Sequence, residues 1–153
     1  MKILRLKRLI FIRHAHRDTT DRELDNGLSE KGRSQVKKLV KLAREELGEK
    51  PFNQERIEFL TSPKRRCVET ISPIAEELGG EIGISGLLDE GDRLEKRVDE
   101  FLEWWRSPLA PLVTVLCSHG DWIPLCLKRL TGQEQDISKG GWAEVSLSIW
   151  DGP

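Results

Sequence analysis

Short apolar runs along the chain alternate with longer segments in which apolar residues recur every three or four positions. The runs at residues 9–12, 57–60 and 112–117 have the length and composition of buried strands. From residue 145 to residue 149 apolar and polar side chains alternate, which predicts a last strand. The first and third runs end in polar residues, as expected for strands that lead into functional loops.

Amphipathic helices are predicted between these strands. The apolar positions of the first helix are Val36, Leu39, Val40, Ala43 and Leu47. Ser29 is a candidate N-cap for this helix, and Gly48 with Pro51 should end it. The first helix therefore joins the first two strands.

Three more helices follow the second strand. Ser62-Pro63 offers an N-cap with proline at the first helical position, for a helix that should continue to Leu78. Phe101, Leu102 and Trp105 indicate a third helix, and a fourth is expected over residues 125–130. The alternation of strands and helices predicts an α/β fold, a three-layer α/β/α sandwich with a mostly parallel central sheet.

Composition narrows the classes of function. A chain of 153 residues fits one domain, and 25 Lys and Arg against 26 Asp and Glu give no overall attraction to nucleic acid or membrane. No segment has the apolar length of a signal peptide or a membrane span. Cys67, Cys117 and Cys126 lie in or beside apolar runs, as buried thiols do in a reducing compartment. The expected location is cytoplasmic, and any anion site must be local.

Cationic side chains follow three of the predicted strands. Arg13 and His14 come after the first strand, Arg66 after the second, and His119 after the strand at residues 112–117. Loops at the carboxyl ends of parallel strands meet at one crevice, so these side chains should lie close together. Closely spaced guanidinium groups need an anion between them, and the first turn of a helix adds positive potential at Arg66. The cluster predicts a phosphate site in which neighbouring cations lower the pKa of His14 and keep it a neutral nucleophile.

Four segments carry a resemblance to a known family. They are Arg13-His14-Ala15, Leu28-Ser29-Glu30-Lys31-Gly32, Ser62-Pro63-Lys64-Arg65-Arg66-Cys67-Val68-Glu69-Thr70 and Val115-Leu116-Cys117-Ser118-His119-Gly120. In this order they resemble the motifs of the histidine phosphatase superfamily, which includes the cofactor-dependent phosphoglycerate mutases and small phosphohistidine phosphatases. The resemblance implies a single phosphoglycerate mutase-like domain over residues 1–153. Ala15 replaces the usual glycine of the first motif, which requires negative φ at that position.

The resemblance also implies roles for individual residues, with no metal and no other cofactor. His14 is the nucleophile that forms a phosphohistidine, and Arg13, Arg66 and His119 bind the phosphoryl oxygens. Glu90, in the segment Leu88-Asp89-Glu90, is the candidate general acid.

Two assignments stay open. Asp89 and Asp92 lie in the same polar loop as Glu90, so either is an alternative general acid. Arg17 is either a further phosphate contact or an exposed surface charge.

The same residues allow two other interpretations. His14, His16 and Asp18 also begin a binuclear metal hydrolase pattern, but only His119 remains as a further imidazole ligand. A non-catalytic phospho-binding module would keep the pocket without turnover, and tryptophans on the surface would favour such a partner role. Trp104, Trp105, Trp122 and Trp142 are expected to be buried instead.

The favoured function is phosphatase rather than mutase, because the chain lacks the insertions of the longer mutase branch. Its small size resembles the phosphohistidine phosphatase branch. The expected substrate is a phosphorylated small molecule or a phosphohistidine on a protein, and no oligomeric state is implied.

Overall fold

A five-stranded, mostly parallel sheet forms the centre of the computed structural model, which describes residues 3–48 and 56–151. The strands are β1 (Ile3–Arg13), β2 (Ile57–Thr61), β3 (Ile82–Ile84), β4 (Val113–Ser118) and β5 (Trp142–Asp151). Their order is β3-β2-β4-β1-β5; the first four are parallel, and β5 runs antiparallel to β1.

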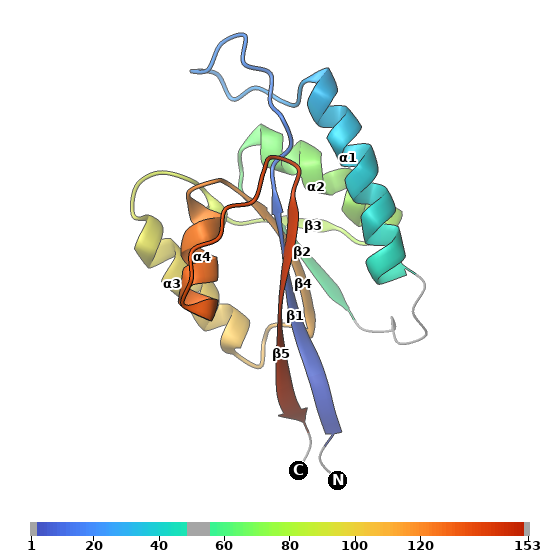
Figure 1. The fold of residues 1–153 in the computed structure, drawn as a ribbon, viewed down its shortest axis with the longest axis vertical. Coiled ribbons are helices and arrows are strands. Elements are labelled where there is room, and N and C mark those ends of the chain that lie inside the picture. The colour runs from blue at the N-terminus through green and yellow to red at the C-terminus, as the bar shows by residue number, and fades with distance from the viewer. Residues whose placement is uncertain (1–2, 49–55, 152–153) are drawn as a thin grey trace.

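Helices cover both faces of this sheet (Figure 1). They are α1 (Glu30–Ala43), α2 (Arg65–Glu77), α3 (Leu94–Arg106) and α4 (Trp122–Thr131), with a π-helical turn η1 (Arg44–Gly48) and a 3-10 turn η2 (Gly86–Leu88). Figure 1 shows α1 and α2 on one side of the sheet and α3 and α4 on the other. The predicted three-layer α/β/α sandwich with a mostly parallel sheet is confirmed.

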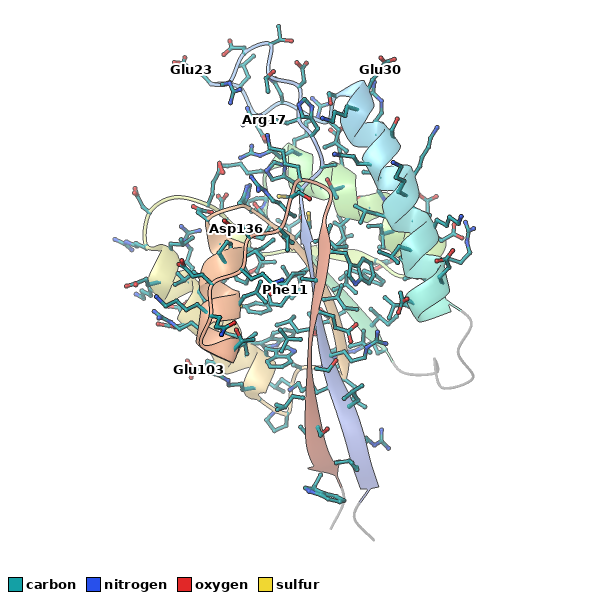
Figure 2. All side chains as sticks on the ribbon, in the orientation of Figure 1. Phe11, Arg17, Glu23, Glu30, Glu103 and Asp136 are labelled. Atoms are coloured by element: carbon teal, nitrogen blue, oxygen red, sulfur yellow. The ribbon has the colours of Figure 1, made fainter. Side chains whose placement is uncertain are left out.

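Each face of the sheet has its own apolar core. Ile10 and Ile12 of β1 pack with α1 and α2, whereas Leu9 and Phe11 pack with α3 and α4. Phe11 lies in the middle of the molecule in Figure 2. Burial on both faces explains why residues 9–12 form an unbroken apolar run rather than an alternating one.

The start of α1 agrees with the prediction, and that of α2 does not. Ser29 caps α1, and its hydroxyl accepts a hydrogen bond from the Gly32 amide at 3.1 Å. Ser62-Pro63 was expected to begin α2, but this helix begins at Arg65 after an extended Lys64 that makes no side-chain cap. The Ser62 hydroxyl lies 2.8 Å from Nε2 of His119, so it contacts this ring rather than capping the helix.

Other differences concern half-exposed segments. β1 begins at Ile3, well before its apolar run, since its first half pairs with β5 while Leu4 and Leu6 remain exposed. The short strand β3 and the turn η1 were not predicted, and α4 begins at Trp122 rather than residue 125. Pro51 lies outside the described residues.

The cysteines and most of the tryptophans are covered. Cys67, Cys117 and Cys126 are buried and free. Trp105 and Trp122 are fully buried, and Trp104 and Trp142 are half-buried. Trp104, Trp105 and Trp122 therefore offer no broad surface for a partner. Within the described part of the chain, no helix is both long enough and apolar enough to cross a bilayer.

Substitution of Gly32 by alanine is expected to destabilise the protein. Alanine normally favours a helix by about 1 kcal/mol over glycine, but a Cβ at Gly32 would lie 2.0 Å from the His16 carbonyl oxygen. We expect Gly32→Ala to lower the free energy of unfolding by about 1–3 kcal/mol in urea titrations. Ser34→Ala, at an exposed position of the same helix, is the control and should be neutral. A Gly32→Ala protein as stable as the wild type would contradict this.

Candidate active site

The loops after β1, β2 and β4 bring His14, Arg66 and His119 together. Arg13 of β1 lies opposite Ser118 of β4, so each histidine leaves its strand at the same level of the sheet. The two imidazole rings are 5.4 Å apart between centroids, and Nη2 of Arg66 lies 3.4 Å from Nδ1 of His119. All three side chains are at most 5% exposed. The convergence expected from the sequence is therefore present.

A backbone hydrogen bond orients the ring of His14. Its Nδ1 lies 2.9 Å from the Ala15 carbonyl oxygen, and a carbonyl can only accept, so Nδ1 carries the hydrogen. The unprotonated nitrogen of the neutral ring is then Nε2. Thr70 holds this backbone in place, because its hydroxyl accepts from the Ala15 amide at 3.0 Å. The only non-glycine residue with positive φ among those described is Arg93, so Ala15 meets the requirement for replacing glycine.

The environment of His14 favours its neutral form. Burial is the largest cause and, with the charges of His119, Arg66 and Arg13, it lowers the pKa of His14 to about 3. The hydrogen bond to Ala15 acts in the opposite direction. A depressed pKa was expected, but the cationic neighbours contribute less than the removal of water.

Arg13 reaches the same site from the last position of β1. Its Nη1 donates to the Ile137 carbonyl at 3.0 Å, while its buried Nε has no hydrogen-bond partner among the described residues. Gly120 makes room for the guanidinium, since a Cβ there would lie 2.7 Å from Nη2 of Arg13. An unpaired donor of this kind is what an anionic ligand would satisfy.

Arg66 is paired with a carboxylate. Its Nη2 donates to Oε1 and Oε2 of Glu90 at 2.5 and 2.7 Å, and Oε2 lies 3.2 Å from Nδ1 of His119. The Nε of Arg66 is buried without a partner among the described residues. The cationic cluster thus already holds an anionic group, and that group is the candidate general acid.

The acidic loop before α3 is held in place by Arg97, a residue for which no role was predicted. Arg97 donates to the backbone carbonyls of Asp89, Glu90 and Asp92. Asp89 accepts from the Glu90 amide at 2.8 Å and lies 3.5 Å from Nζ of Lys64, whereas Asp92 is exposed. Glu90 is therefore the acid of this loop with the closest contacts to the cationic cluster. An arginine one helical turn into α3 carries no sequence signal of this function.

The other ring nitrogen of His119, Nε2, contacts a second group of polar side chains. This nitrogen lies 2.8 Å from Oγ of Ser62, which in turn donates to Oδ1 of Asp89 at 3.4 Å. Cys67, the residue after Arg66, places its Sγ 3.5 Å from the same Nε2. Burial opposes ionisation of this thiol, but hydrogen bonds to Cys117 and His119 and the charges of His119 and Arg66 lower its pKa. Ser62 was interpreted only as a helix cap, so its contact with His119 was not foreseen.

Arg17 lies on the rim of the site. Its Nη2 donates to the carbonyls of Arg22 and Leu24 at 3.2 and 3.1 Å, and its Nε is buried without a partner among the described residues. A cavity of about 150 Å³ is lined by Arg17, Arg22, Lys64, Arg66 and Glu90 together with Glu23, Leu24 and Asp25. Figure 2 shows Arg17 and Glu23 at the end of the molecule opposite the chain termini. Larger hollows of about 800 and 680 Å³ lie elsewhere and contain none of the predicted site residues.

Cations from another loop add to this rim. Burial lowers the pKa of Lys139, and so do the charges of Arg13, Arg22, Arg17 and Lys31. Four basic and three acidic residues line the cavity, and Lys139 with Arg13 and Lys31 adds further positive charge near Arg17 and Arg22. This arrangement favours phosphorylated or otherwise anionic ligands.

The side chains of the metal alternative are held by different partners. Nδ1 of His16 lies 2.6 Å from Oγ of Ser29 at the start of α1, and Asp18 accepts from the amide and hydroxyl of Thr20. Across residues 3–48 and 56–151, no group of three or more His, Cys, Asp or Glu side chains is arranged to hold a metal ion. In this structure His16 therefore contacts the N-cap residue of α1.

Comparison with known proteins defines the class to which this fold and site belong. Residues 9–93 match the family model of the histidine phosphatase superfamily, branch 1. The chain belongs to that superfamily, and it is a hydrolase of the phosphatase type. No functionally curated protein matches the sequence.

Several solved structures share the fold. A candidate alpha-ribazole-5'-P phosphatase from Escherichia coli is 16% identical with a TM-score of 0.74, covering 95% of this chain and 94% of its own. The candidate phosphohistidine phosphatase SixA from Agrobacterium tumefaciens is 17% identical with a TM-score of 0.71, covering 96% and 98%. A mycobacterial glucosyl-3-phosphoglycerate phosphatase is 20% identical with a TM-score of 0.65, covering 93% and 91%. At these identities the likeness supports the fold, not a substrate.

The protonation state of His14 can be measured directly. Because the pKa of His14 is lowered from 6.5 to about 3, its ring should remain neutral, with the hydrogen on Nδ1, from pH 7 down to about pH 4. Nitrogen-15 NMR of the imidazole groups, with His14→Gln to assign the signal, tests this expectation. A His14 ring that is cationic at pH 6 would contradict it.

Proposed function

We propose that this protein is a metal-independent phosphatase that hydrolyses a phosphomonoester or a protein phosphohistidine through a phosphohistidine intermediate on His14. The observation that carries the proposal is the orientation of His14. Its Nδ1–H is bound to the Ala15 carbonyl, which leaves the Nε2 lone pair available in a site that also holds Arg66 and His119. A neutral imidazole with a fixed tautomer is the form that attacks phosphorus.

The reaction proceeds in two transfers. Nε2 of His14 forms a bond to phosphorus while the bond to the leaving atom breaks, and Glu90 gives that atom a proton. Arg13, Arg66 and His119 bind the phosphoryl oxygens, with the unpaired Nε atoms of both arginines available as donors. Water then attacks the phosphorus and gives a proton to Glu90, while the bond between phosphorus and Nε2 of His14 breaks. Inorganic phosphate leaves, and the lone pair returns to Nε2.

The pairing of Glu90 with Arg66 fits this sequence of events. In the free protein the carboxylate neutralises the cations that would otherwise repel each other in a buried site. A phosphoryl group offers the same donors stronger acceptors, so it displaces the carboxylate. Once released from Arg66, Glu90 takes up a proton from solvent, and this is the proton that it gives to the leaving group.

The rim favours small or locally exposed phosphoryl groups. The cavity beside Arg66 measures about 150 Å³ and is lined by Arg17, Arg22 and Lys64, so Arg17 is assigned as a further phosphate or substrate contact. A phosphomonoester with a second anionic group and a phosphohistidine on a protein surface both fit these features. The likeness to SixA supports the second class, and that to the glucosyl-3-phosphoglycerate phosphatase supports the first. The free, buried cysteines support a cytoplasmic location.

Replacement of His14 should abolish turnover. His14→Ala removes the nucleophile, so hydrolysis of p-nitrophenyl phosphate should fall to the background rate, while excess EDTA should leave wild-type activity unchanged. His16→Gln is the matched control, and it should retain activity because His16 contacts Ser29 rather than the cluster.

The other outcomes separate the alternatives. Activity that is lost with EDTA and with His16→Gln would establish the metal hydrolase instead. Vanadate binding without turnover of any phosphorylated substrate would establish a phospho-binding module.

Replacement of Glu90 should lower kcat by an amount that depends on the leaving group of the substrate. Glu90→Gln should lower kcat for a serine phosphate by about 10²–10⁴-fold, the usual contribution of a general acid. The loss should be smaller for p-nitrophenyl phosphate and for phosphohistidine, whose leaving groups need less protonation. Asp92→Asn, in the same loop but exposed, is the control. Equal losses for all three substrates, or a loss with Asp92→Asn alone, would contradict the assignment.

A further inference from the structure

The outer edge of β5 is the open end of the sheet beside β1. The strand order places β5 last, and its backbone ladder within the described residues is made with β1 alone. Figure 1 shows the sheet nearly edge-on, with β5 in front of the other strands and no helix drawn over it. Along this edge no other described strand is hydrogen-bonded to β5, so the edge is available to another strand.

Exposed apolar side chains flank the half of this edge that lies away from the candidate active site. Leu4 and Trp150 are paired across β1 and β5 and are 56% and 69% exposed, and Leu6 beside them is 50% exposed. Leu147 on the opposite face is 48% exposed. The lower halves of β1 and β5 extend beyond the helices in Figure 1, and no described residue covers these side chains. Exposed apolar groups on both faces of a sheet edge favour association.

The edge also lacks the usual protection against pairing. Residues 142–150 contain no lysine, arginine or proline, and Glu144 is their single charged residue. Glu144 is neutralised by Arg8 of β1 at 2.7 Å and accepts from the Ser146 hydroxyl at 2.7 Å. Its charge therefore does not repel a neighbouring strand strongly.

The sequence of β5 is nearly symmetrical about Ser146. Counting outward, Val145 matches Leu147, Glu144 matches Ser148, Ala143 matches Ile149, and Trp142 matches Trp150. In an antiparallel pair of identical strands centred on Ser146, every cross-strand pair would thus join residues of like character. Opposed aromatic and apolar pairs on one face are what stabilise adjacent strands.

We propose that two copies of this chain associate through β5, antiparallel and centred on Ser146, so that their five-stranded sheets form one continuous ten-stranded sheet. Trp142 of one copy lies opposite Trp150 of the other, next to Leu4. The contact is isologous, as in most homodimers.

The proposed dimer leaves both candidate active sites open. Each site lies at the carboxyl end of β1, near the start of β5, because Arg13 donates its amide to the Gly141 carbonyl at 3.2 Å. Antiparallel pairing places the two sites at opposite ends of the shared edge. Loss of the dimer should therefore not remove activity, and the proposal does not depend on the function proposed above.

Charge at the centre of the pairing provides the test. Ser146 of each copy faces Ser146 of the other, so Ser146→Lys or Ser146→Glu alone places like charges together, and a mixture of the two variants places opposite charges together. Sedimentation velocity of the wild type should give the mass of two 17.5-kDa chains at micromolar concentration. Each variant alone should sediment as a monomer, and the mixture should restore the dimer. Gln133→Lys, at an exposed position after α4, is the matched control and should remain dimeric.

A covalent test does not depend on those charges. Ser146→Cys should form a disulfide-linked dimer on mild oxidation, while Ser148→Cys, displaced from the centre, should not. A wild-type chain that is monomeric at all concentrations would overturn the proposal. A dimer that persists in both charged variants would also overturn it, because the interface would then lie elsewhere.

Discussion

The site depends on positive charge that is buried at the carboxyl ends of the parallel strands. Arg13, Arg66 and two imidazoles gather where the strands end, and buried cations require an anion nearby. Glu90 supplies that anion in the free protein. In the proposed reaction a phosphoryl group takes the place of Glu90 beside Arg66, and Glu90 can then act as the acid. Recognition and chemistry thus arise from one electrostatic arrangement.

A few local contacts within the fold position the residues of the site. Parallel pairing of β1 with β4 sets both histidines at one level. Gly120 leaves room for Arg13, and Thr70 on α2 holds the backbone whose carbonyl orients His14. Ser29 joins the start of α1 to His16 in the loop that leads to the rim.

Much of the fold was predictable, because buried strands and helices have a local pattern of apolar residues in the sequence. Residues 9–12 and 112–117 were recognised as strands, and parallel connections then required their following histidines to meet. The contacts of Ser62 and Arg97 were not predictable, since they depend on groups far away in the chain. The main cause of the low pKa of His14 was missed for the same reason, as burial is a property of the folded protein.

The central claim is that His14 carries the phosphoryl group during turnover. Rapid acid-free quenching of the protein with a phosphorylated substrate, followed by peptide mass spectrometry under alkaline conditions, tests it most directly. The account predicts a single phosphorylated histidine at His14, stable in base, lost in acid, and formed as fast as the substrate is consumed. Full turnover with no phosphorylated protein, or with phosphate on another residue that forms at the turnover rate, would contradict the account.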